Sequence, residues 1–413
     1  MDSMPTIEDI PSEVLKLLGA DVYQQLATLS RGMHQLVVRS CTSLTCTSHT
    51  SDSAEPDEAH LSTEFLMRRL RVCTAEGMMP RSMFASYATD TFSPLLELVD
   101  IAPRLQRLHL SGTYQNALSD ISPLTSLKSV KHLELSGFTK MSSISPLSSM
   151  TNLTDLRLDD LEELSSLTGL ADLKALASLQ ISELNDSLDI NSLESVTCLR
   201  HLYMYRMEGV THLSPLSSMT RLQNLELVNS SEVADLGPLS SLTDLKRLLL
   251  YDFNTVTHID PLVHLVGLKD VRISGIPQLS NLASLASLTA VENLKITYVS
   301  DVSDLGPLSG MMALKRLKLR SMDVVDLRPL SYLTGITSLL MSDFHRVADV
   351  SPLVSLTNLE DLGLFDFISL TDLRPLASLA RLTRLYILDM SDEVDLAQQL
   401  SGQLSHVEDV RLS

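Results

Sequence analysis

Aromatic and cationic residues are scarce in this chain of 413 residues. Tryptophan is absent, and Phe, Tyr and Trp together make up 4% of the sequence, so any large core must be aliphatic. Lys and Arg number 32 against 51 Asp and Glu, which gives a net charge of −19. Such an acidic chain is a poor candidate for general binding to nucleic acid or to anionic membranes.

Cysteine is also rare, with four residues in the chain. Extracellular repeat arrays often carry disulfide-rich caps, and the absence of that pattern favours a reducing compartment, which we expect to be the cytoplasm. Cys41, Cys46, His49, His60 and Cys73 follow no spacing of a known zinc framework. We therefore expect free thiols and no bound metal.

Long apolar runs are missing too. No stretch approaches the ~20 residues that span a bilayer, so we expect no membrane helix. The first residues, MDSMPTIEDIPSEV, are acidic and contain no apolar segment, which argues against a secretory signal.

What the sequence does contain is one recurring phrase, SISPLSSMTNLTDLRL at 143–158. It returns as HLSPLSSMTRLQNLEL at 212–227 and as DVSPLVSLTNLEDLGL at 349–364. Its register position recurs every 23 residues from Pro123 to Gln398, apart from a single step of 22. A fixed period of this length indicates a repeat array that folds as one solenoid.

Each repeat predicts two elements. Serine is a common helix N-cap and proline suits the first helical position, so Ser-Pro-Leu predicts a short helix or 3₁₀ turn. The alternating leucines of Leu-x-x-Leu-x-Leu predict a short strand whose leucines point inward. The sequence contains fourteen such strand pairs: Leu108/Leu110, Leu133/Leu135, Leu156/Leu158, Leu179/Ile181, Leu202/Met204, Leu225/Leu227, Leu248/Leu250, Val271/Ile273, Leu294/Ile296, Leu317/Leu319, Leu339/Met341, Leu362/Leu364, Leu385/Ile387 and Val410/Leu412.

Three residues after the last strand leucine, most repeats carry an apolar residue where Asn or Cys is usual. We expect these side chains to stack into an apolar spine, so that the turn backbone must find its hydrogen-bond partners elsewhere. The spine positions are Phe138, Leu161, Leu184, Met207, Phe253, Ile276, Val299, Met322, Phe344 and Phe367.

Residues 91–413 thus resemble leucine-rich repeat proteins of the 22–23-residue type. They resemble internalin-like arrays and, more closely, the kinetoplastid leucine-rich-repeat proteins described as adenylate-cyclase regulators. The resemblance implies an α/β solenoid shaped as a horseshoe. A parallel sheet would form its concave face and short helices or 3₁₀ turns its convex side, with a small helical region at the N-terminus. It implies a fold rather than a function, since this scaffold serves many partners.

Residues 1–45 lack the repeat and read as helical. Within them, residues 7–40 resemble an F-box, through Ile10-Pro11-x-Glu13-Val14-Leu15 and the stretch from Arg31 to Leu36. The match departs where Asp21 follows the first helix too closely and where His34 replaces a tryptophan. A true F-box implies a ubiquitin-ligase adaptor as partner, whereas the alternative is a helical cap over the first repeat. Residues 46–90 read as a polar linker followed by a helix that leads into the array.

Catalytic motifs are not recognisable: the sequence has neither a phosphate-binding glycine loop nor a nucleophile elbow. We therefore predict a protein without enzymatic activity and without a cofactor. The side chains that alternate with the strand leucines should form the binding surface instead. Tyr and Arg are enriched at interface hot spots, and a stripe of such residues is unexpected in an acidic chain. The candidate partner-binding residues are Tyr203, Tyr205, Arg247, Tyr251, Arg272, Lys295, Arg316, Lys318 and Arg320.

This stripe predicts a docking groove for an acidic or extended segment of a protein. The alternative is that these are ordinary solvated strand positions with cross-strand charge pairing. A smaller apolar patch is expected at Gly363, Phe365, Tyr386 and Leu388. The predicted function is a non-catalytic interaction scaffold, with an F-box-type substrate receptor and a surface adhesin or effector as alternatives.

Overall fold

The computed structural model describes residues 43–46, 82–86, 105–112, 119–389 and 407–412. The F-box-like stretch at 7–40 lies outside these residues, as do the predicted helix before the array and most of the predicted linker. The chain divides into two compact units, unit 1 over Met1–Ser192 and unit 2 over Leu193–Ser413.

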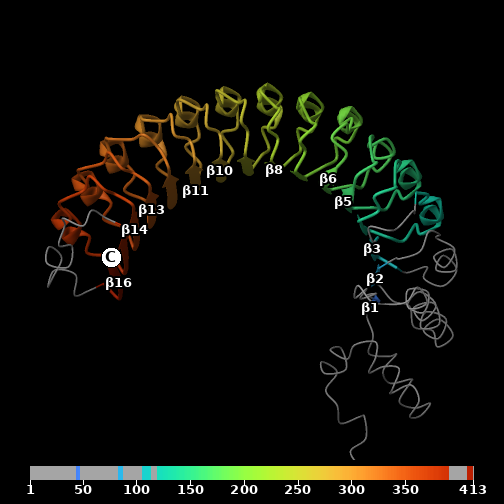
Figure 1. Cartoon of the computed structure of the whole chain (residues 1–413), viewed down its shortest axis with the longest axis horizontal. Helices are drawn as coiled ribbons and strands as arrows, with labels where there is room; N and C mark the ends of the chain where they lie inside the picture. The colour runs from blue at the N-terminus through green and yellow to red at the C-terminus, as the bar shows by residue number, and fades with distance from the viewer. Residues whose placement is uncertain (1–42, 47–81, 87–104, 113–118, 390–406, 413) are drawn as a thin grey trace, which may run out of the picture. The chain divides into compact units, whose positions relative to one another are not determined.

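Each unit is built on a parallel sheet whose strands pair with one another in sequence order. Within each unit the strands line the inner side of the curve and short 3₁₀ helices line the outer side (Figure 1). In unit 1 the strands are β1 (Ser43–Cys46), β2 (Ser82–Ser86), β3 (Arg107–Ser111), β4 (His132–Ser136), β5 (Asp155–Leu161) and β6 (Ser178–Leu184). In unit 2 they are β7 (His201–Tyr205), β8 (Asn224–Val228), β9 (Arg247–Tyr251), β10 (Asp270–Ser274), β11 (Asn293–Thr297), β12 (Arg316–Arg320), β13 (Ser338–Ser342), β14 (Asp361–Phe365), β15 (Arg384–Leu388) and β16 (Asp409–Leu412).

The fourteen predicted strands are confirmed as β3 to β16, and each contains its predicted pair of apolar residues. Strands β1 and β2 were not predicted. The register pairs Met83 with Leu108 and Ala85 with Leu110. Other residue types therefore occupy the leucine positions of β2, which hides this strand from a search for the leucine pattern.

The leucine columns form the core. In β9, for example, Leu248 and Leu250 are completely buried, and in β10 Val271 and Ile273 are as well. Val410 in β16 is the exception, with 39% of its surface exposed. Burial of each fully covered leucine stabilises the fold by about 1.5–3 kcal/mol, which makes these columns the main source of stability.

The 3₁₀ helices lie where Ser-Pro-Leu predicts them. Those in unit 1 are η2 (Ser122–Ser126), η3 (Ser145–Ser149) and η4 (Asn191–Ser195), of which the last continues into unit 2. Those in unit 2 are η5 (Ser214–Ser218), η6 (Gly237–Ser241), η7 (Asp260–His264), η8 (Ala283–Ser287), η9 (Gly306–Gly310), η10 (Arg328–Tyr332), η11 (Ser351–Ser355) and η12 (Arg374–Ser378).

The predicted role of serine as the N-cap is wrong. In η11, Ser351 is the first helical residue, and the N-cap is the apolar Val350, which makes no side-chain cap bond. The side chain two residues before the helix satisfies its first amide instead: the Ser351 N–H donates to Asp349 Oδ1 at 2.8 Å. Aspartate can form this local bond because its short side chain reaches the amide two residues ahead. The same bond recurs at Asp120, Asp189, Asp235, Asp304, Asp326 and Asp372.

The apolar spine is present. Phe138, Phe253, Phe344 and Phe367 are fully buried, and the rings of Phe344 and Phe367 stack with centroids 5.6 Å apart. The turn backbone finds its partners in the next repeat, since the residue before each spine position adopts a left-handed conformation. Asp343, with φ of 62°, donates its N–H to the Phe365 carbonyl at 3.0 Å. These bonds between repeats replace the side-chain ladder that Asn or Cys would supply.

Candidate protein-binding surface

The nine predicted site residues all lie on the inner face of unit 2, on strands β7, β9, β10, β11 and β12. The register places Arg272 opposite Lys295, and Lys295 opposite Lys318. Across β8 to β12, the positions that alternate with the leucines carry six cationic and two anionic side chains, a net of +4. A local positive charge therefore lies within an acidic chain, as predicted.

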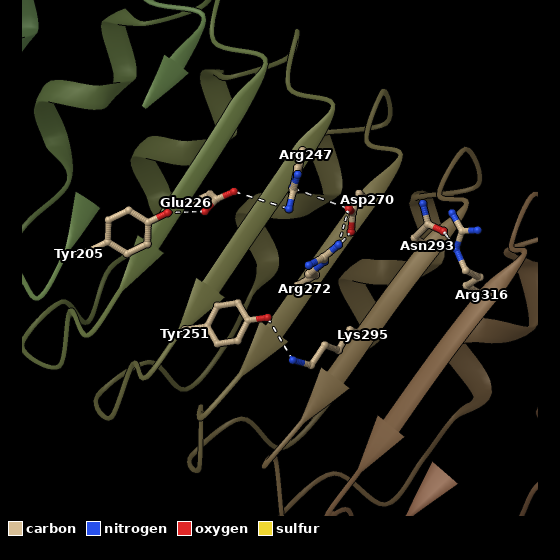
Figure 2. A network of polar contacts seen from close by, with 9 residues as sticks. All are labelled: Tyr205, Glu226, Arg247, Tyr251, Asp270, Arg272, Asn293, Lys295 and Arg316. Atoms are coloured by element: carbon tan, nitrogen blue, oxygen red, sulfur yellow. Dashed lines mark hydrogen bonds and ion pairs between the residues drawn. The ribbon is translucent and has the colours of Figure 1, made fainter. Parts of the chain in front are cut away.

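One part of this face is a closed polar network (Figure 2). The Tyr205 hydroxyl donates to Glu226 Oε2 at 2.6 Å, and Glu226 Oε1 lies 3.7 Å from Arg247 Nη2. Arg247 Nε lies 3.7 Å from Asp270 Oδ2, which makes an ion pair but not a hydrogen bond, because this buried nitrogen has no hydrogen-bond partner. Arg272 Nε and Nη2 both donate to Asp270, each at 3.1 Å.

The titration behaviour of this network follows from its contacts. Burial, together with the hydrogen bond to Glu226, raises the pKa of the Tyr205 hydroxyl. The hydrogen bonds to Asp270 raise the pKa of the Arg272 guanidinium. Both groups hold their protons more firmly than free side chains do, so the network stays intact across the physiological pH range.

The other part of the face is open. Lys295 Nζ contacts the neutral Tyr251 hydroxyl at 3.2 Å and lies 5.1 Å from the centroid of its ring. Arg316 Nε donates to the neutral amide oxygen of Asn293 at 2.7 Å (Figure 2). Lys318 is exposed and, among the described residues, makes no hydrogen bond or ion pair. The ammonium group is partly screened from water by its neighbours, and this partial burial, followed by the nearby charges of Lys295 and Arg320, lowers the pKa of Lys318.

The two remaining site residues lie at the margins. Arg320 Nε donates to Asp343 Oδ2 at 2.9 Å, and its guanidinium lies 5.1 Å from the Tyr298 ring centroid. Tyr203 on β7 lies opposite Glu226 in the register. Arg320 is therefore already neutralised, whereas Tyr203 lies beside the closed network, on the same strand as Tyr205.

Sequence reasoning missed the carboxylates of this face. Glu226 and Asp270 occupy the same strand positions as the predicted cations, so the repeat pattern places them on the inner face. The pattern does not say which cation each carboxylate pairs with. Asp343 lies in the turn after β13, outside the strand columns. A list of cations alone therefore overstates the free positive charge.

The predicted apolar patch lies on β14 and β15. Gly363 is buried, and a Cβ at this position would lie 2.7 Å from Phe365 Cε2, so a larger residue would require that ring to move. The Tyr386 hydroxyl donates to Asp409 Oδ2 at 2.6 Å, and the Arg411 guanidinium lies over the Tyr386 ring. The contacts with β16 thus cover one side of this patch with polar groups.

Unit 1 presents a different inner face. A shallow hollow over β3 to β6 contains contacts between acidic and basic side chains of neighbouring strands. His109 Nδ1 lies 2.8 Å from Glu134, which also lies 3.5 Å from Arg157, and His132 Nδ1 lies 2.9 Å from Asp155. Its charges neutralise one another. Within the described part of the chain, no group of three His, Cys, Asp or Glu side chains is placed to hold a metal ion.

Comparison with known proteins places this geometry in a class of folds. No family model and no curated protein matches the sequence. Among solved structures, an internalin (InlF) from Listeria monocytogenes is 25% identical, with a TM-score of 0.60 over 79% of this chain and 89% of that one. A leucine-rich repeat protein from Leptospira interrogans is 16% identical, with a TM-score of 0.55 over 80% of this chain and 89% of that one.

The fold is thus that of a leucine-rich repeat solenoid, as the repeat predicted. The internalin resemblance is supported by a solved structure, while the closer likeness to kinetoplastid proteins stays a prediction. No helix in the described ranges is both long enough and apolar enough to cross a membrane.

Proposed function

We propose that this chain is a non-catalytic scaffold that binds a protein partner on the inner face of unit 2. The observation that carries this proposal is the open part of that face. Lys295, Arg316 and Lys318 lie on two neighbouring strands, and their contacts among the described residues are to neutral groups or to none. Such cations remain available to a partner in a chain whose net charge is −19.

The architecture supports binding rather than catalysis. Catalysis requires unlike groups that converge in a water-poor pocket, whereas an open parallel sheet offers an extended surface. Stacked repeats commonly use such a surface to hold a partner. Tyr203, Tyr205 and Tyr251 add broad, half-buried aromatic area next to the cations, a composition typical of interface hot spots.

The partner is an acidic or extended protein segment. An extended chain can follow the row of strands and meet several repeats in succession. We do not propose nucleic acid as the partner, because the net charge of the chain would repel a polyanion at long range. We place its action in the cytoplasm, on the scarcity of cysteine. The roles of F-box-type receptor and of surface adhesin stay predictions from the sequence, since residues 7–40 lie outside the described ranges.

Site-specific photo-cross-linking tests the proposal. A photoreactive phenylalanine analogue at Tyr203 on the inner face should cross-link a partner that the same analogue at Thr243, exposed outside the strands, does not. The cross-linked protein is then identified, purified and titrated against the full chain. Replacing both Arg316 and Lys318 by glutamate should weaken that binding by about 100-fold or more, since each charged contact at an interface contributes about 1.5–3 kcal/mol.

The matched control is Arg328→Glu, because Arg328 is an exposed arginine on η10, on the outer side of the unit. It should leave binding unchanged. The double variant of the inner face should melt at the wild-type temperature, whereas Arg328→Glu loses its contact with Asp326 and should melt slightly lower without losing the partner. Equal cross-linking from both faces, or unchanged affinity after the double charge reversal, would show that the partner does not dock here.

A further inference from the structure

The charges of the inner face of unit 2 separate into two groups. Glu226 and Asp270 neutralise Arg247 and Arg272, and the contact with Asp343 neutralises Arg320. The cations that remain are Lys295, Arg316 and Lys318. Among the described residues, none of these three forms an ion pair with a carboxylate.

These three side chains can reach a common point. Lys295 and Lys318 are opposite each other in the register of β11 and β12, and neighbouring strands lie about 4.8 Å apart. Arg316 lies two residues before Lys318 on the same face of β12, about 7 Å away along the strand. Their side chains are long and flexible enough for two ammonium groups and one guanidinium to surround a single anion.

The positive charges around Lys318 repel one another. The fold places Lys295 and Arg320 near Lys318, and these charges, after the larger effect of burial, lower the pKa of that lysine. A bound anion would relieve the repulsion. The existing contacts leave the charges of Lys295 and Arg316 unneutralised, because their partners are the hydroxyl of Tyr251 and the amide of Asn293. Lys295 now points toward Tyr251 on β9 (Figure 2), so its flexible side chain must turn toward β12 to share an anion with Lys318.

Resting on the proposed function, we infer that Lys295, Arg316 and Lys318 form a subsite for one phosphorylated side chain of the partner protein. A carboxylate brings one charge and two acceptor oxygens. A phosphomonoester brings a charge of about −1.5 to −2 and three strong acceptor oxygens, which match three cationic donors. The planar guanidinium of Arg316 can bind two of these oxygens at once, and the ammonium groups can bind the third.

The surroundings select a single phosphate rather than a chain of phosphates. Asp270 and Glu226 line the face toward β8, and Asp343 lies next to Arg320 on the opposite side. Because these carboxylates already occupy the neighbouring arginines, the face offers no unpaired cations on either side to the flanking phosphates of a nucleic acid. A peptide with one phosphorylated residue needs no such cations, because the backbone on either side of its phosphate is neutral.

The test uses the full chain and three fluorescein-labelled peptides that differ at one residue. They are Gly-Ser repeats with a central phosphoserine, glutamate or serine, and binding is measured by fluorescence anisotropy at low salt. The phosphoserine peptide should bind about tenfold more tightly than the glutamate peptide. Lys318→Ala should remove about tenfold of that affinity, and Lys318→Arg should retain most of it. Arg328→Ala, on the outer side, is the matched control and should have no effect.

Several outcomes would overturn the inference. Equal affinity for the phosphoserine and glutamate peptides would show a site for acidic peptides without a preference for phosphate. Unchanged binding by Lys318→Ala would place the phosphate elsewhere, and tighter binding of a single-stranded oligothymidylate would indicate a nucleic-acid site.

Failure of the inference is distinguishable from failure of the proposed function. The partner that cross-linking at Tyr203 identifies can be purified and treated with phosphatase before it is titrated against the full chain. If its affinity is unchanged by phosphatase yet lost on double charge reversal at Arg316 and Lys318, the scaffold function stands and the phosphate subsite does not.

Discussion

Single side chains show why charge on a surface is not the same as charge available for binding. Arg272 and Lys295 lie opposite each other in the register of neighbouring strands. Arg272 is held by two hydrogen bonds to Asp270, whereas Lys295 contacts only a neutral hydroxyl. Breaking an ion pair of a half-buried arginine costs free energy. We therefore expect a partner to contact the cationic side chains that have no acidic neighbour.

At the same scale, the aromatic spine carries a large share of the local stability. Replacing Phe367 by alanine should lower the free energy of unfolding by about 3–5 kcal/mol, because the ring is fully buried and stacks on Phe344. Denaturant unfolding monitored by circular dichroism measures this loss. Ile368→Ala is the matched control, since Ile368 is 53% exposed and should cost little. Similar losses in both variants would mean that the stack is not a source of stability.

The aspartates before the 3₁₀ helices make the stability of the fold depend on pH. The hydrogen bond from the Arg374 side chain and that from its backbone N–H lower the pKa of Asp372 to about 2. A carboxylate with a depressed pKa stabilises the fold above its unfolded pKa of about 3.9, and this contribution disappears as the pH falls through about 2. Asp372→Asn should therefore lower the melting temperature at pH 7, and the difference from wild type should shrink between about pH 4 and pH 2.

A thermal-melt series from pH 7 to pH 2 measures this effect. Arg374→Ala removes the side-chain hydrogen bond to Asp372 and should reproduce part of the drop in melting temperature. The variant with both substitutions should lose less than the two single variants added together. A melting-temperature difference that does not change with pH would show that the carboxylate charge is irrelevant to the turn.

At the scale of the secondary-structure element, the turn after a strand sets where that strand ends. Most of the described strands are followed by a sharp turn, and most repeats place a non-glycine residue in the left-handed region at that turn. Asn229 has φ of 54° after β8 and donates its N–H to the Tyr251 carbonyl at 3.0 Å. A Cβ in this conformation costs free energy, which asparagine tolerates better than most residues.

Asn229→Gly should therefore be neutral or stabilising by up to about 1 kcal/mol, whereas Asn229→Val should destabilise by about 1–2 kcal/mol. Both variants keep the backbone hydrogen bond, so the difference reports conformation alone. Chemical denaturation compares them directly. If valine is tolerated as well as glycine, the left-handed turn is not required for this repeat.

The strands and 3₁₀ helices were predictable because local rules determine them. Leucine alternation defines β3 to β16, and proline fixes the start of most outer helices. The N-cap prediction was wrong because Ser351 lies inside the helix, and the preceding Asp349 competes successfully for its amide. The ion pairs on the inner face could not be predicted from the sequence either. Asp270 can reach both Arg247 and Arg272, and the choice between partners depends on side-chain rotamers that no repeat pattern specifies.

At the scale of the whole molecule, stability in a repeat array arises between neighbours. Within unit 2, each strand pairs only with the strands before and after it. Each outer helix likewise lies beside those of adjacent repeats. A defect in one repeat should therefore spread to its neighbours and fade with distance, unlike a defect in a domain with a single shared core.

Leu285 in η8 offers the test, because this leucine is completely buried between β10 and β11 in the chain. Leu285→Ala should cost about 2–5 kcal/mol in its own repeat. In hydrogen–deuterium exchange followed by mass spectrometry, amides of β10, β11 and β12 should exchange faster, while those of β14 and β15 keep their wild-type rates. Ala286→Gly, at the neighbouring exposed position, controls for a general effect of substitution in this turn. Uniform acceleration across all strands of unit 2 would show that the unit unfolds as one cooperative body, and a partner bound on its inner face would then stabilise every repeat equally.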